Sequence, residues 1–319
     1  MRILVTGATG MIGRAVVERL RRVDAQLTAT SFDATSPWSD VPFEHVDLRD
    51  YRSVTQICEG VDVVVHIAGI KGSVGLTKEK PATFMAPLMQ MNTNVFAACQ
   101  AAGVARVIYT SSIGVYSPGE LISESDLDWS LPPMDTHPGW AKRMGELQLA
   151  AMRVEDPGFT YAIARPSNVY GPGDNFNPET AMVIGALLGR AFRGETPVEV
   201  LGTGTAVRDF VYSDDVAEAI ERLVYSDFSG DLNLGAGSGI SIRELASHIA
   251  DVTGVPLTFA DTSVDEGFTS RILSVRKARE AIGWEATTDI KTGLSTTWKW
   301  LLVNGADPVG RLDYFADSS

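Results

Sequence analysis

The sequence predicts an α/β fold, a doubly wound parallel sheet followed by a smaller C-terminal lobe. Short apolar segments alternate with segments of helical periodicity through the first half of the chain. The strand segments are apolar throughout rather than at every second residue, which is typical of parallel strands that helices cover on both faces. After Pro166 the composition changes, and this change marks the start of the second lobe.

The predicted elements follow one another in regular order. A strand at residues 2–5 ends at Thr6-Gly7, and a helix follows at 11–20. The same alternation predicts a third strand that ends at Asp47 and a strand Thr160–Pro166 that the proline stops. The remaining strands are expected at 26–31, 61–67 and 105–112, and the remaining helices at 51–58, 93–102 and from 142 to about 152.

The segment after Pro166 is predicted to be a ligand-facing loop. SNVYGPGDNFNPET is rich in Gly, Pro, Asn and Asp, and such loops beyond the carboxyl ends of strands hold the ligands of doubly wound sheets. A helix at 182–193 and a strand and helix within RDFVYSDDVAEAIERLV follow, and the polar tail from Gly305 is expected to be partly disordered. We predict a dinucleotide-binding domain at 1–166 and 208–235 and a substrate lobe at 167–207 and 236–319.

Composition and charge exclude several classes of function. The formal charge of −13 over 319 residues argues against a nucleic-acid-binding surface. No apolar run reaches the roughly 18 residues of a membrane span, and the sequence opens without a charged leader, so we expect a cytoplasmic protein. Cys58 and Cys99 lie among apolar residues and are expected to be buried thiols rather than a disulfide or metal ligands, and no metal site is predicted.

A glycine-rich turn follows the first strand. GATGMIG places Gly7, Gly10 and Gly13 between a predicted strand and a predicted helix that begins with Met11 and Ile12. Glycines permit a tight turn and a close approach of backbone N–H groups to a pyrophosphate, and the helix terminus favours its negative charge. This context predicts a Rossmann-type dinucleotide site.

Residues at the ends of later strands are candidate cofactor contacts. Asp47, followed by Leu48, is placed to accept a hydrogen bond from the adenine amino group, and a cap for the following helix is the alternative role. Ala68 and Gly69 are small, so the cofactor can pass close to the backbone there.

The end of the second strand bears on the choice between NAD and NADP. Ser31 stands where an acidic residue would bind the ribose 2′-hydroxyl of NAD, and Arg14 follows the last glycine of the turn, which suits the 2′-phosphate of NADP. Asp33 is close enough in sequence to reverse this inference. NADP is slightly favoured over NAD.

Motifs along nearly the whole chain resemble one family. GATGMIG, HIAG, VIYTSSIGVY, AKRMGE, RPSNVYGPGDNFN, RDFVYSDDVAEAI and GLSTTWKWLLVN are similar in order and spacing to those of the extended short-chain dehydrogenases/reductases, in the branch of NAD(P)-dependent nucleotide-sugar epimerases and dehydratases. Within this branch they look most like the GDP-L-fucose synthases, which epimerise and reduce a GDP-4-keto-6-deoxyhexose. The resemblance implies NAD(P) and a nucleoside-diphosphate hexose as ligands.

The resemblance also implies roles for individual residues. Ser112 matches the serine that bonds to the C4 oxygen of the sugar, and Lys142 matches the lysine that holds the nicotinamide ribose. Arg208 and Arg271 match basic residues that face the substrate diphosphate, which guanidinium groups bind in bidentate fashion; a solvated surface position is the alternative for Arg271. Further implied contacts are Asn168 and Asn175 in the sugar pocket and Pro166 beside the cofactor.

The positions that carry the chemistry depart from the family pattern. Pro138 stands four residues before Lys142, where the family has the tyrosine that exchanges a proton with the sugar hydroxyl. In the fucose-synthase branch a cysteine and a histidine do further proton transfer, and Gly114 and Met182 occupy these positions. The candidate substitutes are His137 and Lys71, each with a surface position as the alternative.

Three functions remain open on these grounds. The chain is interpreted as an NAD(P)-dependent nucleotide-sugar epimerase, dehydratase or reductase with rearranged acid–base groups. Alternatively it retains slow hydride transfer through Ser112 and Lys142 alone, or it is a non-catalytic NAD(P)- and nucleotide-sugar-binding protein, a sensor or partner subunit. The resemblance also implies a homodimer that pairs helices near residues 92–102 and 141–152.

Overall fold

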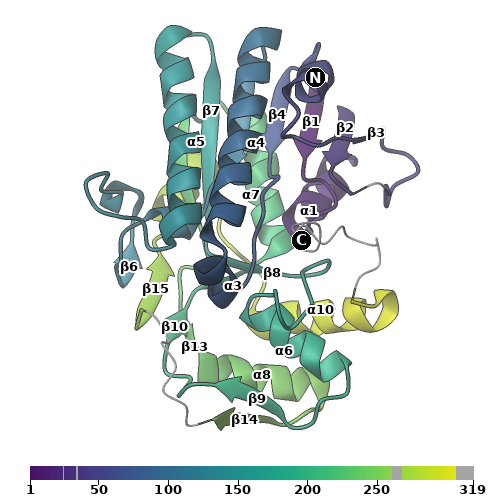
Figure 1. Ribbon diagram of the computed structural model, residues 1–319, viewed down its shortest axis with the longest axis vertical. Coiled ribbons are helices and arrows are strands. Elements are labelled where there is room, and N and C mark those ends of the chain that lie inside the picture. The colour runs from purple at the N-terminus through teal and green to yellow at the C-terminus, as the bar shows by residue number, and fades with distance from the viewer. Residues whose placement is uncertain (24, 34, 261–267, 307–319) are drawn as a thin grey trace.

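A parallel sheet forms the centre of the larger part of the molecule (Figure 1). The computed structural model describes residues 1–23, 25–33, 35–260 and 268–306. Seven strands lie in the order β12-β7-β5-β4-β1-β2-β3, and each neighbouring pair is parallel. They are β1 (Arg2–Thr6), β2 (Gln26–Ser31), β3 (Phe43–His45), β4 (Val63–His66), β5 (Arg106–Thr110), β7 (Thr160–Pro166) and β12 (Gly230–Leu234).

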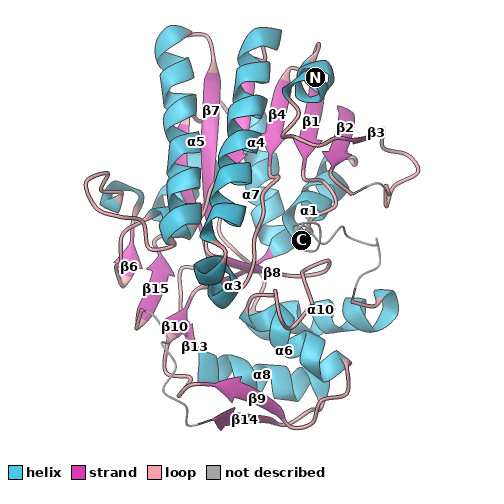
Figure 2. Ribbon diagram, in the orientation of Figure 1, coloured by secondary structure: helices cyan, strands magenta, loops and turns pink. Residues whose placement is uncertain are grey.

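Helices cover both faces of this sheet, and each face buries its own apolar core (Figure 2). The predicted doubly wound α/β fold is therefore confirmed. One face carries α1 (Met11–Leu20), α7 (Ser213–Tyr225) and α9 (Arg276–Ile282), and the other carries α2 (Tyr51–Cys58), α4 (Pro81–Ala102) and α5 (Thr136–Glu155). Cys58 and Cys99 are free and buried in the second core, as expected.

The strand order reverses between β1 and β4. β2 and β3 extend the sheet to one side of β1, whereas β4, β5, β7 and β12 extend it to the other side. The crevice outside the carboxyl ends of strands at such a reversal is where doubly wound sheets bind ligands. The turn after β1 and the segment after β4 therefore face the expected cofactor position.

A smaller lobe lies beyond the carboxyl ends of these strands, and it has a separate apolar core (Figure 1). Its three small sheets have the orders β13-β10-β15-β6, β11-β8 and β14-β9. The strands are β6 (Leu121–Ile122), β8 (Asn168–Tyr170), β9 (Val198–Leu201), β10 (Val207–Arg208), β11 (Phe210–Tyr212), β13 (Ile240–Ser241), β14 (Leu257–Ala260) and β15 (Ser270–Leu273). The helices are α6 (Val183–Phe192), α8 (Ile242–Thr253) and α10 (Ile290–Asn304), with the short α3 (Val74–Glu79) above them and the one-turn η1 (Ile113–Val115) and η2 (Glu124–Asp126) beside β6.

Several predicted boundaries were wrong. α4 begins at Pro81 rather than at residue 93, and α5 begins at Thr136 rather than after Lys142. In both cases a proline lies in the first helical turn, where its missing N–H costs nothing and its fixed φ suits the helix. The third strand ends at His45, before Asp47.

The segments on either side of the predicted domain boundaries also differ from expectation. The expected loop after Pro166 contains β8, which pairs with β11, and β10 pairs with β13 and β15. Residues 207–212 therefore pair with strands of the lobe, and the return to the main sheet comes with α7 and β12. Residues 307–319 of the tail lie outside the described part of the chain. No helix in the described ranges is both long and apolar enough to cross a membrane.

Candidate functional site

The glycine turn has the geometry that a pyrophosphate needs. Gly7 has a φ of +67°, and a Cβ on it would lie 2.6 Å from the Cα of Ala68. A Cβ on Gly13 would lie 2.1 Å from the carbonyl oxygen of Gly7. Gly10 is the N-cap of α1, so the first N–H groups of the helix, on Met11 and Ile12, lack intrahelical acceptors and face the crevice. Gly7 and Gly13 are thus required by backbone packing, and the site of Gly10 is tight, with 3.3 Å between its Cβ position and the carbonyl oxygen of Gly7.

A short hydrogen-bonded cluster closes the turn against the end of β2. The hydroxyl of Thr9 lies 2.5 Å from the hydroxyl of Ser31 and donates to Asp33 Oδ2 at 2.6 Å. The carboxylate of Asp33 is thus held beside the glycine turn, although Ser31 ends the strand. The guanidinium of Arg14 lies 5.9 Å from the ring of Trp300 in α10 and so turns towards the lobe.

The two residues after β3 make local contacts. Asp47 binds Arg49 through both carboxylate oxygens, with a shortest distance of 2.7 Å. The N-cap of α2 is Asp50, whose side chain accepts from the backbone of Arg52, so the alternative capping role of Asp47 was wrong. Leu48 is buried, and its carbonyl accepts from Asn94. The adenine contact of Asp47 stays a prediction.

Lys142 lies at the carboxyl end of β5, opposite the segment after β4. Its Nζ donates to the carbonyl of Thr110 at 2.7 Å and lies 3.6 Å from the position of a Cβ on Gly69. Burial, and next the charge of nearby Lys71, lower the pKa of Lys142 to about 8. The amine therefore adjoins the small Ala68-Gly69 segment, where the cofactor is expected to pass.

A buried ion pair fixes α5 on the sheet and with it the position of Lys142. Glu146, one helical turn after Lys142, accepts from Arg165 Nη2 at 2.8 Å and from Arg165 Nε at 3.0 Å. Ser111 donates to the same carboxylate at 2.5 Å. Glu146 and Arg165 are each 3% exposed. Charge-assisted bonds in such a dry place hold the helix in one register. Sequence reasoning missed both residues, although Glu146 lies in the AKRMGE motif.

Ser112 lies two residues beyond the backbone contact of Lys142. It is the N-cap of η1, and its Oγ accepts from the backbone of Gly114 at 3.0 Å. Pro166 is buried at the end of β7, the neighbouring strand. The structure thus brings Ser112, Lys142 and Pro166 to one edge of the sheet.

The two predicted diphosphate-binding arginines lie side by side. Arg208 on β10 and Arg271 on β15 are register partners in a parallel pair, so their side chains project from the same face. Arg271 lies over the ring of Phe268 at 4.6 Å, and its buried Nε has no hydrogen-bond partner in the described part of the chain. A solvated surface position is therefore wrong for Arg271. Two adjacent guanidinium groups form a strong site for a diphosphate.

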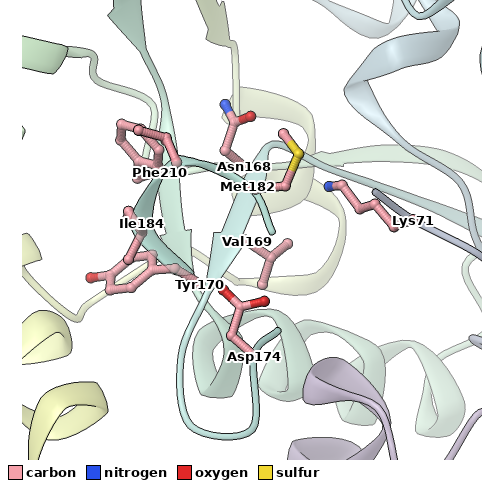
Figure 3. A pocket seen from close by; sticks show the side chains of 9 residues that line it. Lys71, Asn168, Val169, Tyr170, Asp174, Met182, Ile184 and Phe210 are labelled. Atoms are coloured by element: carbon pink, nitrogen blue, oxygen red, sulfur yellow. The ribbon is translucent and has the colours of Figure 1, made fainter. Parts of the chain in front are cut away.

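Other residues that the sequence singled out line a pocket (Figure 3). Its lining includes Lys71, Asn168, Tyr170, Asp174, Met182 and Phe210. Lys71 reaches towards Met182 and Asn168 (Figure 3). Asn175 differs, because its amide donates to Thr180 and its Oδ1 accepts from the backbone of Asn177 within its own loop.

Comparison with known proteins decides the family. The model of the NAD dependent epimerase/dehydratase family matches residues 3–235. The chain belongs to the NAD-dependent epimerase/dehydratase family. The matched residues contain the glycine turn, Lys142 and the candidate sugar pocket.

Relatives from curated proteins and solved structures cover almost the full chain. A probable GDP-L-fucose synthase of Oryza sativa subsp. japonica is 30% identical over 318 residues, which cover 95% of this chain and 92% of the relative. The structure of a UDP-glucose 4-epimerase of Thermotoga maritima with UDP-glucose is 25% identical, with a TM-score of 0.84 over 95% of this chain and 99% of that one. MoeE5 in complex with UDP-glucuronic acid and NAD is 29% identical, with a TM-score of 0.83 over 95% and 99% of the two chains.

The start of α5 is where this member of the family departs from the expected site. Pro138 lies in the first turn of α5, on the same helix face as Lys142, which follows four residues later. His137, the predicted substitute, is exposed in the same turn rather than in a loop, and it points about 100° away from Pro138 around the helix axis. The structure does not bring His137 to the pocket residues.

Sequence reasoning missed an acidic residue at this point. Asp135 directly precedes α5, and its carboxylate lies where a side chain on Gly114 would stand, 2.2 Å from the ideal Cβ position. Its Oδ1 lies 3.4 Å from Arg271 Nη1. No spacing in the sequence identifies Asp135, because only the fold brings it to Gly114 and Arg271.

Proposed function

We propose that the protein is an NAD-dependent enzyme that epimerises, dehydrates or reduces a nucleoside-diphosphate hexose. The observation that carries this proposal is the position of Lys142. Its amine lies beside Gly69 in the cofactor crevice and donates to the carbonyl of Thr110 at the end of β5, two residues before Ser112. A buried amine with a pKa of about 8 at the edge of this crevice supports a functional role for Lys142.

The residues present fit a dinucleotide. Three close backbone approaches at the glycine turn leave N–H groups for the pyrophosphate, and the small segment after β4 leaves a path to Lys142. When bound, the nicotinamide accepts a hydride from a sugar carbon or returns it. Lys142 would hold the ribose, and Ser112 would hold the oxygen on the reacting carbon.

We propose NAD rather than NADP as the preferred cofactor. The sequence favoured NADP because Ser31 is not acidic, and that preference stays untested. However, Asp33 is held by Thr9 beside the turn, where a carboxylate suits the ribose 2′-hydroxyl and repels a 2′-phosphate. The direction of Arg14 towards Trp300 supports the same choice. Titration with NAD and NADP should give a ratio of dissociation constants of at least about 10 in favour of NAD.

The substrate proposal rests on the paired arginines and the pocket. Arg208 and Arg271 would bind the diphosphate, and Asn168 and Lys71 would line the sugar site. The nucleotide base is open between GDP, which the rice relative's name contains, and UDP, which the solved relatives bind.

A non-catalytic binding protein is the second candidate, and Pro138 favours it. A proline has no proton to exchange, and general acid–base catalysis is commonly worth roughly 100- to 10,000-fold. A sensor would need the same two ligand sites without the chemistry. Only a measurement of turnover separates the two candidates.

The test is incubation of the protein with NAD and, in turn, UDP-glucose, UDP-glucuronic acid and GDP-mannose. We expect one of these sugars to reduce the bound cofactor or to give a new sugar in NMR spectra. Binding of both ligands without any conversion would favour the sensor. A protein that binds neither NAD nor any nucleotide would contradict both candidates.

We also propose a homodimer through α4 and α5. α4 has no charged residue in its 22 positions, and Leu147 and Val154 on α5 are 44% and 82% exposed. These exposed apolar side chains beside an uncharged helix support a protein contact on this face. Sedimentation should give a dimer, and Val154→Glu should shift it towards the monomer, whereas Val303→Glu, which changes an exposed valine on α10, should not.

A further inference from the structure

The carboxylate of Asp135 occupies the space of a missing side chain. Gly114 lies in η1, two residues after Ser112, and an ideal Cβ on Gly114 would lie 2.2 Å from Asp135 Oδ2 and 2.5 Å from its Cγ. The backbone N–H of Asp135 donates to the carbonyl of Gly114 at 3.2 Å, which holds the two segments together. Asp135 thus presents a carboxylate beside the turn of Ser112, although it lies 21 positions further along the chain than Gly114.

Pro138 removes one of the two backbone donors that could hold this carboxylate at the start of the helix. Asp135 is the N-cap residue of α5, and an N-cap aspartate normally accepts from the N–H of the second or third helical residue. The third helical residue is Pro138, which has no N–H, and the side chain of Asp135 makes no cap bond. Thr136, the first helical residue, has a φ of +45°, a rare conformation that costs about 1–3 kcal/mol and is found most often at functional sites.

Asp135 also lies on the path that a nucleotide sugar would take. Its Oδ1 lies 3.4 Å from Arg271 Nη1, on the strand pair expected to hold the diphosphate. On the other side it adjoins the turn of Ser112. The side chain of Asp135 is 42% exposed, so a ligand can reach it.

We propose that Asp135 is the catalytic acid–base residue that acts in place of the missing tyrosine. This inference rests on the proposed function and names the group that transfers the proton. Asp135 accepts the proton of a sugar hydroxyl while the C–H bond of the same carbon breaks and its hydride reduces bound NAD. The sugar is oxidised to a ketone and the carboxylate becomes a carboxylic acid. The return of the proton and the hydride to the ketone reverses the step.

The contact with Arg271 serves this role. A guanidinium near Oδ1 keeps the carboxylate in place, and Oδ2 packs against Gly114. A bound diphosphate would contact the guanidinium of Arg271 as well. The sugar attached to the diphosphate would then lie beside Asp135. The packing of Ile113, Met134 and Leu273 in one small core holds η1, the segment before α5 and β15 against one another.

The test compares Asp135→Asn with Asp128→Asn. Asp128 is an exposed carboxylate of the same connecting segment that bonds to Ser130, so it is a matched control. For each variant, calorimetry measures the binding of NAD, UDP and GDP, and stopped-flow absorbance measures the reduction of bound NAD by UDP-glucose, UDP-glucuronic acid or GDP-mannose. We expect D135N to reduce NAD at least about 100-fold more slowly than the wild type, with cofactor and nucleotide affinities within about threefold. D128N should match the wild type.

Two further variants separate catalysis from a role in structure. Asp135→Glu should recover part of the rate and change its pH profile, because the carboxylate is kept but moved. Gly114→Ala should slow the reaction as D135N does, since the added Cβ displaces the carboxylate without removing it. A structural role alone would change the melting temperature and leave the pH profile unaltered.

The outcomes distinguish this inference from the proposed function. Wild-type rates in D135N, with both ligands bound, would contradict the role of Asp135 and leave the proposed function intact. A wild-type protein that binds NAD and a nucleotide sugar but never reduces the cofactor would also contradict it and would favour the sensor. A protein that binds neither ligand would contradict the proposed function and this inference together.

Discussion

The glycine turn after β1 and the start of α5 are both helix N-termini at the same crevice, yet they are specified in different ways. The turn needs glycines that lie within seven residues, because Gly10 and Gly13 pack against the backbone of the turn itself and Gly7 packs against the backbone of Ala68 after β4. The start of α5 depends on contacts from distant segments, namely Gly114 and Arg271 against Asp135. A site built from backbone atoms is readable from a short motif, whereas a site built from side chains of three segments is not.

The largest effect is expected at Glu146, which anchors α5 on the sheet. Glu146→Gln should destabilise the protein by about 3–5 kcal/mol, because it removes the buried carboxylate that pairs with Arg165 and leaves only Asp231, which is 28% exposed, as a charge partner. Urea denaturation measures the free energy of unfolding. Glu155→Gln, which changes an exposed carboxylate at the end of α5, is the control and should cost less than about 0.5 kcal/mol. Equal effects of the two variants would show that α5 is not anchored by this pair.

The first region is tested by Gly7→Ala. The added Cβ meets the backbone of Ala68 at 2.6 Å, and φ at this position is +67°, so we expect a loss of about 2–4 kcal/mol and at least about tenfold weaker NAD binding. Gly75→Ala in α3 is the matched control, because no atom lies within 4 Å of its Cβ position. There the change should be neutral or stabilising by up to about 1 kcal/mol. Unchanged NAD affinity in Gly7→Ala would remove the basis for calling this turn a phosphate site.

Lys142 connects the two regions, and its pKa predicts a pH dependence. The pKa is about 8 in the folded protein and about 10.4 in an unfolded chain. Between these values the unfolded state binds more protons, so this lysine makes stability rise with pH. Below pH 8 Lys142 is charged in both states, and the cost of burying this charge lowers the free energy of unfolding in full. Lys142→Met should therefore be more stable than the wild type at pH 7, by roughly 2 kcal/mol, and the difference should shrink by pH 10. Denaturation curves at both pH values measure it, and a constant difference would contradict the depressed pKa.

The smallest structural effect is expected at Pro138. Pro138→Tyr restores the family phenol and the N–H of the third helical residue, and the change in stability should stay within roughly 1 kcal/mol. If the start of α5 lacks only the phenol, the rate of sugar-dependent NAD reduction should rise by about tenfold. Pro138→Phe restores the same N–H without a hydroxyl and should give no gain in rate. An equal gain in both variants would show that space, rather than a proton, limits the reaction.

The sequence was sufficient for the parallel sheet because its strands are apolar throughout and the helices between them are periodic. It was not sufficient for the first turns of α4 and α5, since Pro81 and Pro138 were read as interruptions although proline is tolerated there. Family motifs placed Ser112, Lys142 and Arg271 on one side of the molecule. They could not place Asp135, which has no counterpart in a motif and acquires its position only when η1, α5 and β15 pack together.

The contact of Asp135 with Gly114 also constrains the order in which such a site can arise by mutation. Any side chain at position 114 would collide with the carboxylate, so a glycine there has to precede the carboxylate or appear together with it. The proline at 138 releases the N-cap side chain only once that space is open. An evolutionary path towards this arrangement therefore passes through a protein that already has glycine at position 114. In that protein the family tyrosine can still be present and active.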